Sequence, residues 1–216
     1  PYQISGTNFF IQNWDRLYHG NVPMSRALAW SYNVPAVRAF ETVGYERAKH
    51  FAEKIGIPVT KDEPTTAIGG NVDGVSPLQM AAAFASFGNK GYYNKPSTIV
   101  KVFNANGKEL PSMRDNAVKA MSEETAYLMT NVLKGVLTNN GISPNGKVAN
   151  FDMAGKSGST TFDDSAQRMY GIDVINSTKD SWMVGYTTEY TVSVWQGADV
   201  VDSAAKALSS NQAQTT

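Results

Sequence analysis

The stretch that decides the fold is residues 151–197, FDMAGKSGSTTFDDSAQRMYGIDVINSTKDSWMVGYTTEYTVSVWQG. Three of its segments predict strands: Phe151–Thr160, Ser181–Thr187 and Tyr190–Gln196. A short turn at residues 188–189 joins the last two, which predicts an antiparallel meander. A polar segment separates the first strand from the second.

Helical patterns fill most of the chain before this sheet. Apolar residues recur at helical spacing in five segments: Pro23–Ala29, Val34–Val43, Tyr45–Ile55, Leu78–Phe87 and Ser122–Leu137. Ser76-Pro77-Leu78-Gln79 is a strong helix start, because serine can cap the helix and Gln79 can close a capping box. Thr98–Phe103 alternates as a strand. The expected fold class is therefore α+β, an antiparallel β-sheet flanked by helices.

The two ends of the chain lack such patterns. Residues 1–20 are polar and aromatic without a sustained period and predict a surface loop. Residues 198–216 are rich in Ala, Ser and Gln and predict a tail helix followed by a disordered end. We therefore place a domain boundary after residue 197.

Composition narrows the function classes. The 19 Lys and Arg residues balance 19 Asp and Glu residues, so no net basic field favours nucleic acid as a partner. Cysteine is absent and there are only two histidines, which leaves no cluster typical of a metal site. No apolar run approaches the roughly 20 residues that a membrane-spanning helix needs. We expect neither a metal nor another cofactor.

The chemistry concentrates at Gly155-Lys156-Ser157-Gly158-Ser159. A phosphate-binding loop would need a glycine at position 150, which is Asn150, and a helix after the motif. The alternative is a Lys-Ser-Gly triad on a strand that lines a cleft, where lysine supplies positive potential and hydroxyls bind a carboxylate. The small glycine would let a substrate backbone lie against the strand.

A second element expected of such a site is Ser-x-Asn, and the sequence contains three of these tripeptides. They are Ser31-Tyr32-Asn33, Ser143-Pro144-Asn145 and Ser209-Ser210-Asn211. Ser143 stands in a turn bounded by Gly and Pro, and Ser209 stands in the tail. Ser31 lies between two apolar helical segments, which favours the first tripeptide; the alternative is that Ser31 only caps a helix.

Several motifs in the same order resemble the transpeptidase domain of class A penicillin-binding proteins. They are NWDR (13–16), GNV (20–22), ALAWSYNVPAV (27–37), GVSPLQMA (74–81), GYY (91–93) with Pro96, GKSGSTT (155–161) and KDSWMVGYT (179–187). The resemblance covers nearly everything from Asn13 to Gly197. It implies the DD-transpeptidase/β-lactamase-like fold, with residues 1–197 as the C-terminal part of an incomplete domain.

The resemblance also implies roles for individual residues. Ser31 would move protons between the nucleophile, the leaving amine and Lys156, and Asn33 would orient the acyl-donor peptide. Lys156 would support proton transfer electrostatically, and the hydroxyls of Ser157 and Ser159 would hold the substrate or β-lactam carboxylate. The substrate-binding run would be Ser157, Gly158, Ser159 and Thr160. The backbone N–H of Ser159 would form half of an oxyanion hole. Many family members have threonine at positions 157 and 159, and serine keeps the hydroxyl.

One departure from the family pattern concerns the nucleophile. The family nucleophile lies in a Ser-x-x-Lys before the Ser-x-Asn, and residues 1–30 contain none. The only match, Ser203-Ala204-Ala205-Lys206, follows the last strand and is expected to be fortuitous. We therefore expect the nucleophile in an upstream segment of the same parent protein, and we expect this chain alone to be inactive.

The sequence leaves three functions to compare. The first is a serine-type D-Ala-D-Ala transpeptidase that cross-links peptidoglycan stem peptides and binds β-lactam antibiotics. The second is a module that binds such ligands without catalysis. The third is a serine β-lactamase, for which the Glu-x-x-Leu-Asn of the common class is missing. The resemblance implies an extracytoplasmic location and a parent protein anchored to the cytoplasmic membrane.

Overall fold

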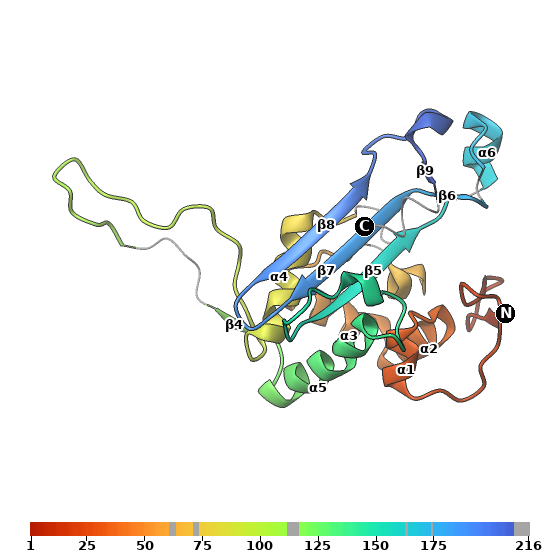
Figure 1. The fold of residues 1–216 in the computed structure, drawn as a ribbon, viewed down its shortest axis with the longest axis horizontal. Coiled ribbons are helices and arrows are strands. Elements are labelled where there is room, and N and C mark those ends of the chain that lie inside the picture. Colours follow the sequence, from red (N-terminus) through yellow and green to blue (C-terminus); the bar gives the residue numbers. More distant parts are fainter. Residues whose placement is uncertain (61–63, 71–73, 112–116, 163, 174, 210–216) are drawn as a thin grey trace.

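The computed structural model describes residues 1–60, 64–70, 74–111, 117–162, 164–173 and 175–209. Its centre is a three-stranded antiparallel sheet in the order β5-β7-β8, formed by Ala154–Thr160, Asp180–Tyr186 and Thr191–Gly197 (Figure 1). The register pairs Lys156 with Val184, and Val184 with Ser193. The predicted antiparallel meander is confirmed.

The helices before the sheet agree with the predicted segments. They are α1 (Met24–Ala29), α2 (Asn33–Val43), α3 (Tyr45–Lys54), α4 (Pro77–Gly88) and α5 (Glu123–Lys134). Ser76 accepts a hydrogen bond from the Gln79 N–H, and the Gln79 side chain accepts one from the Ser76 N–H. This reciprocal pair is the predicted capping box, with Pro77 at the first helical position.

The core lies between the sheet and its helices. One face of the sheet carries Ala154, Val184 and Tyr186, all of them buried. Helix α4 packs on β7 and β8, and α5 packs on β5. Leu133, Val136 and Leu137 complete the main cluster, in which Val136 is fully buried. A well-packed core at this place fixes β5 relative to the helices, as the site requires.

The remaining elements are short. The strands are β1 (Tyr2–Gln3), β2 (Phe10–Ile11), β3 (Tyr92–Tyr93), β4 (Val118–Lys119), β6 (Ser177–Thr178) and β9 (Leu208–Ser209). The helices are η1 (Pro64–Ile68), η2 (Gly135–Leu137), η3 (Pro144–Gly146), α6 (Asp164–Tyr170) and η4 (Ala204–Lys206). Strands β1 and β2 pair with each other, so the predicted surface loop at residues 1–20 contains a small hairpin. Among the described residues, no helix combines the length and apolar character that crossing a bilayer requires.

Two predicted elements are wrong. Thr98–Phe103 is not a strand, since only Phe103 forms a single bridge, with Glu109. Residues 98–111 project from the body (Figure 1), and Val100 is 72% exposed. Within the described part of the chain, no neighbouring strand therefore completes the pattern. Instead of a tail helix, the chain after residue 197 forms the short η4 and then β9, which pairs with β6. The pairing of Leu208 with Thr178 requires an extended backbone, which ends the helical turn. The predicted disordered end, residues 210–216, lies outside the described residues, and the boundary at 197 stays a prediction.

Candidate active site

Lys156 and Ser31 meet between β5 and the turn that joins α1 to α2. The Lys156 Nζ donates to Ser31 Oγ at 2.7 Å and to the Ser157 carbonyl oxygen at 2.7 Å. The side chain is half-buried, and burial lowers the pKa of Lys156 to about 8. An amine with that pKa can exchange a proton with a neighbouring hydroxyl near neutral pH.

Ser31 is held in an unusual backbone conformation. Its φ is 54°, in the left-handed region that serine seldom adopts. The Ser31 N–H bonds to the Leu28 carbonyl at 3.0 Å and the Tyr32 N–H bonds to the Ala27 carbonyl at 2.9 Å. This is the Schellman pattern that ends a helix, with serine where glycine is usual. The turn therefore directs the hydroxyl to Lys156, and the left-handed backbone has a conformational cost. Ser31 follows the end of α1, and Tyr32 is the N-cap of α2, so the alternative in which Ser31 only caps a helix is wrong.

A pair of variants isolates that cost. Both Ser31→Gly and Ser31→Ala remove the hydroxyl, but only glycine adopts the left-handed conformation freely. We expect the glycine variant to have a free energy of unfolding about 1 kcal/mol higher than the alanine variant, measured by denaturant unfolding. Equal stabilities would show that the backbone at residue 31 is not strained.

Asn33 begins α2 and is held by the N-terminal segment. Its Nδ2 donates to the Gln12 carbonyl oxygen at 3.0 Å, and Asn13 Oδ1 accepts from the Val34 N–H at 3.1 Å. Trp14 Nε1 donates to the Trp30 carbonyl oxygen at 2.8 Å. The segment around residue 13, which the sequence predicts to be a loop and which belongs to the quoted family motifs, therefore fixes both sides of the Ser-x-Asn turn.

A second layer supports the turn through Tyr32. The His19 ring stacks on the Tyr32 ring with centroids 4.3 Å apart, and His19 Nε2 lies 2.7 Å from Asp15 Oδ2. The pKa of Asp15 is lowered, first by a hydrogen bond from the Leu17 backbone N–H and also by its bond with His19. The sequence was searched for histidines only as metal ligands, and His19 and His50 are too few and too isolated for a metal cluster. The spacing of four residues between Asp15 and His19 was the available signal for their contact.

The other residues of the Lys-Ser-Gly-Ser-Thr run have separate environments. Gly158 and Ser159 are exposed. The Thr160 hydroxyl donates to Asp180 Oδ2, and Trp195 Nε1 donates to Asp180 Oδ1 at 2.9 Å. These bonds join the end of β5 to β7 and β8, so Thr160 is engaged within the sheet. Ser157 Oγ accepts a hydrogen bond of 2.6 Å from Ser143 Oγ.

Strand β5 is an edge of the sheet within the described residues, since the strand order is β5-β7-β8. One side of its backbone is paired with β7 along its whole length. The opposite side can accept an added extended peptide, with Lys156 and the exposed Ser159 beside it. This arrangement suits a substrate with an extended backbone and a carboxylate.

The other two Ser-x-Asn tripeptides and the Ser-x-x-Lys match do not contribute to the contact between Lys156 and Ser31. Ser209 lies on β9, paired with Ser177 of β6. In the Ser203-x-x-Lys206 match, the Lys206 amine bonds to Asp202 at 2.8 Å, and Ser203 precedes the short η4. Ser143, set aside in sequence reasoning as a turn residue, lies against the Lys-Ser-Gly strand through its bond to Ser157.

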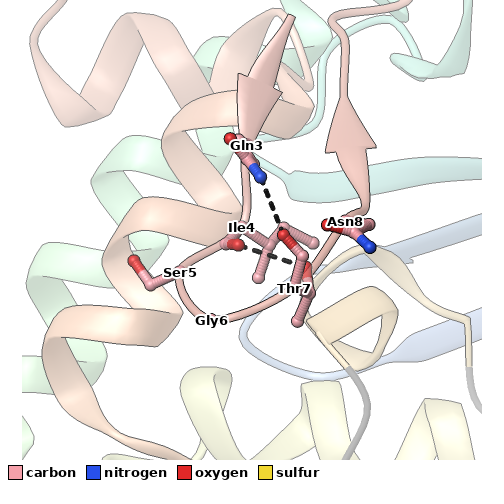
Figure 2. Close-up of a pocket in the computed structure, with 6 residues that line it drawn as sticks. All are labelled: Gln3, Ile4, Ser5, Gly6, Thr7 and Asn8. Atoms are coloured by element: carbon pink, nitrogen blue, oxygen red, sulfur yellow. Dashed lines mark hydrogen bonds between the residues drawn. The ribbon is translucent and has the colours of Figure 1, made fainter.

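The described residues contain no group of three or more His, Cys, Asp and Glu side chains that could hold a metal ion. A hollow of about 380 Å³ lies at the turn between β1 and β2 and is lined by Gln3 to Asn8 (Figure 2). The Gln3 amide donates to the Thr7 carbonyl oxygen across it. Its lining includes neither Lys156 nor Ser31, so the reactive side chains lie outside this hollow.

Comparison with known proteins gives a consistent result. The family model described as the penicillin binding protein transpeptidase domain matches residues 1–216. Penicillin-binding protein 1A/1B of Bacillus subtilis (strain 168) is 40% identical over 207 residues, which cover 94% of this chain and 22% of that protein. Penicillin-binding protein 1A of Streptococcus pneumoniae (strain ATCC BAA-255 / R6) is 37% identical over 203 residues, covering 91% of this chain and 28% of that protein. The chain therefore spans less than a third of the length of either relative.

Solved structures show the same fold at lower identity. Penicillin-binding protein 1A from Haemophilus influenzae superposes with a TM-score of 0.72 at 22% identity, covering 92% of this chain and 33% of that chain. The D,D-transpeptidase domain of a peptidoglycan glycosyltransferase from Eggerthella lenta gives a TM-score of 0.67 at 20% identity, covering 95% of this chain and 54% of that chain. These likenesses confirm the predicted fold class of helices and an antiparallel sheet.

Proposed function

Because this chain belongs to the penicillin-binding protein transpeptidase domain family, we propose that it supplies two of the three parts of a serine acyltransferase site. The third part, a Ser-x-x-Lys nucleophile, lies in an upstream segment of a longer parent protein. The observation that carries the proposal is the 2.7 Å contact between Lys156 Nζ and Ser31 Oγ, made by residues 125 positions apart. The parent protein is a D-Ala-D-Ala transpeptidase that cross-links peptidoglycan stem peptides.

The reaction proceeds in two balanced steps. The upstream serine hydroxyl loses its proton and its oxygen bonds to the carbonyl carbon of the penultimate D-Ala. The peptide C–N bond breaks, and the terminal D-Ala leaves after its nitrogen takes a proton. An amine of a neighbouring peptide then attacks the ester, loses a proton and returns the serine hydroxyl. A β-lactam enters the first step in place of the stem peptide and remains bound as an ester.

Ser31 and Lys156 handle the proton in these steps. The lowered pKa of Lys156 and its direct bond to the Ser31 hydroxyl favour proton exchange along this pair. When the amine is protonated, its positive charge also favours the oxyanion that forms on the attacked carbonyl. The backbone N–H of Ser159 supplies half of the oxyanion hole in this proposal.

The unpaired side of β5 aligns the acyl donor as an added strand. Ser157 and Ser159 hold its terminal carboxylate, Gly158 leaves room for its backbone, and Asn33 orients it through the side-chain amide. Thr160 contributes through the position of the strand end, because its hydroxyl already bonds to Asp180. The stem peptides lie outside the cytoplasmic membrane, so we place the parent protein there, anchored to that membrane.

Replacing Asn33 tests the donor alignment. We expect Asn33→Ala in the complete parent protein to lower the rate of peptide transfer roughly 5- to 150-fold, because a buried amide contact is worth about 1–3 kcal/mol. Thermal unfolding must be measured beside it, since the Asn33 bond to Gln12 also supports the turn. Asn145→Ala, in the second Ser-x-Asn tripeptide, is the matched control. A larger loss in the control than in Asn33→Ala would transfer the role to Asn145.

A further inference from the structure

The loop between η2 and η3, residues 138–143, connects the two halves of the candidate site. The Ile142 N–H donates to the carbonyl oxygen of Ala29, the last residue of α1, at 2.9 Å. The next residue, Ser143, donates through Oγ to Ser157 Oγ on β5 at 2.6 Å. Two consecutive residues of one loop therefore hold the helix that leads to Ser31 and the strand that carries Lys156.

The loop has little freedom to place Ser143 elsewhere. The Ser143 N–H bonds to the Val136 carbonyl oxygen at 3.1 Å. A Cβ on Gly141 would lie 2.3 Å from the Gly135 carbonyl oxygen, and a Cβ on Gly146 would lie 2.4 Å from Met183 Cε. Gly141 is thus required by the close approach of the loop to the backbone of η2, whereas the contact at Gly146 is with the flexible end of a methionine. Ser143 is held by its backbone bond to Val136 and by the tight turn at Gly141.

The direction of the bond between the two serines matters for ligand chemistry. A serine hydroxyl has one proton to donate, and a carboxylate can only accept. Because Ser143 is the donor to Ser157, the Ser157 proton remains available for an anionic acceptor. A hydroxyl that accepts one hydrogen bond also becomes a stronger donor in the next, since the two bonds polarise each other.

We propose that Ser143 is a positioning residue for carboxylate recognition, which orients the Ser157 hydroxyl so that its proton points to the carboxylate of the acyl donor. The inference rests on the proposed function and extends it to a residue outside the Lys-Ser-Gly strand. It assigns a specific task to the second Ser-x-Asn tripeptide, whose serine acts on the ligand through Ser157 and does not take part in proton transfer.

The test compares two probes on the complete parent protein: a penicillin with a free carboxylate and the methyl ester of the same penicillin. We expect Ser143→Ala to lower the second-order acylation rate constant for the free acid about tenfold, while the rate constant for the ester changes less than twofold. Ser143→Thr, which keeps the hydroxyl, should restore most of the loss. Thr138→Ala, which removes a side-chain bond to Gly135 in the same loop, is the control for loosening of the loop.

The outcomes separate this inference from the proposed function. If the unmodified parent protein is not acylated by the free acid, both fail. If it is acylated, and Ser143→Ala lowers the acylation rate constants of both probes equally or of neither, then Ser143 has no role in carboxylate recognition. In that case only this inference fails. Should Ser143→Ala not fold, Ser143→Thr and Ser143→Val replace it, because they differ by a hydroxyl and a methyl group of similar size. If the ratio of the free-acid rate constant to the ester rate constant is the same in Ser143→Thr and Ser143→Val, the inference is overturned.

Discussion

Replacing Lys156 with methionine in the complete parent protein is expected to lower the rate of acylation by a fluorescent penicillin by roughly 10²- to 10⁴-fold. This is the range that a positioned proton-transfer group contributes. Methionine keeps the length and the apolar stem of lysine but has no amine to contact Ser31, so the Ser31 hydroxyl loses its proton partner. The measurement is the second-order rate constant of covalent labelling at pH 7.

The same substitution should not destabilise the protein. The folded state lowers the pKa of Lys156 from 10.5 to about 8, so at pH 7 folding must bury a charged amine. The free energy of unfolding should therefore rise with pH between about 8 and 10.5, where the unfolded chain binds the proton and the folded protein has released it. The full gain over this window is at most about 3 kcal/mol. In Lys156→Met this contribution should disappear, while the opposite contribution of the buried Tyr186 hydroxyl, whose pKa is raised by burial, should remain.

Lys101→Met provides the control for both measurements. Lys101 is 56% exposed and pairs with Glu109 within the projecting residues 98–111. An exposed pair of this kind contributes less than about 1 kcal/mol to stability. An unchanged labelling rate in a folded Lys156→Met protein would remove Lys156 from the site, whatever its distance from Ser31.

The sequence predicted the fold well where local pattern and tertiary packing agree. The meander of β5, β7 and β8 follows from three strand-like segments, the last two joined by a short turn, and the capped start of α4 follows from the Ser76 to Gln79 capping box. Both are local signals. Thr98–Phe103 failed because strand formation needs a partner, and the alternating residues alone cannot show that the segment projects from the body. The tail failed for the related reason that β9 is stabilised by pairing with the distant β6.

In the candidate site too, some features were predictable from the sequence and others depend on contacts between distant segments. The contact between Ser31 and Lys156 agrees with the motif order. The left-handed backbone of Ser31 was not predictable, because serine is not the usual residue there and the conformation depends on the bonds that end α1. Ser143 was assigned to a turn, and it is in one, but only the packing of the loop shows that this turn faces Ser157. The support of Tyr32 by His19 likewise arises from stacking between separate segments.

The second large effect concerns the chain by itself. We expect these 216 residues alone to form no covalent adduct with a β-lactam, although Lys156 and Ser31 are in contact. An oxyanion hole and a proton-transfer pair accelerate attack by a nucleophile but cannot replace it. Its contact with Lys156 does not make Ser31 the acceptor, because Ser31 is the serine of the Ser-x-Asn and the family nucleophile lies in a Ser-x-x-Lys before that tripeptide. Ser203 is unsuitable because Lys206 bonds to Asp202 instead.

Intact-mass spectrometry after incubation with benzylpenicillin tests the central claim most directly. The chain is measured alone, then with the upstream segment of its parent protein supplied as a separate polypeptide, and the complete parent protein serves as the positive control. We predict no mass shift for the chain alone, and one adduct on an upstream serine in the complete parent protein and, where the two pieces reassemble, in the mixture. A stoichiometric adduct on the isolated chain would contradict the account: mapped to Ser31 it would make that residue the nucleophile, and mapped to Ser203 it would place the active site at the end of the chain.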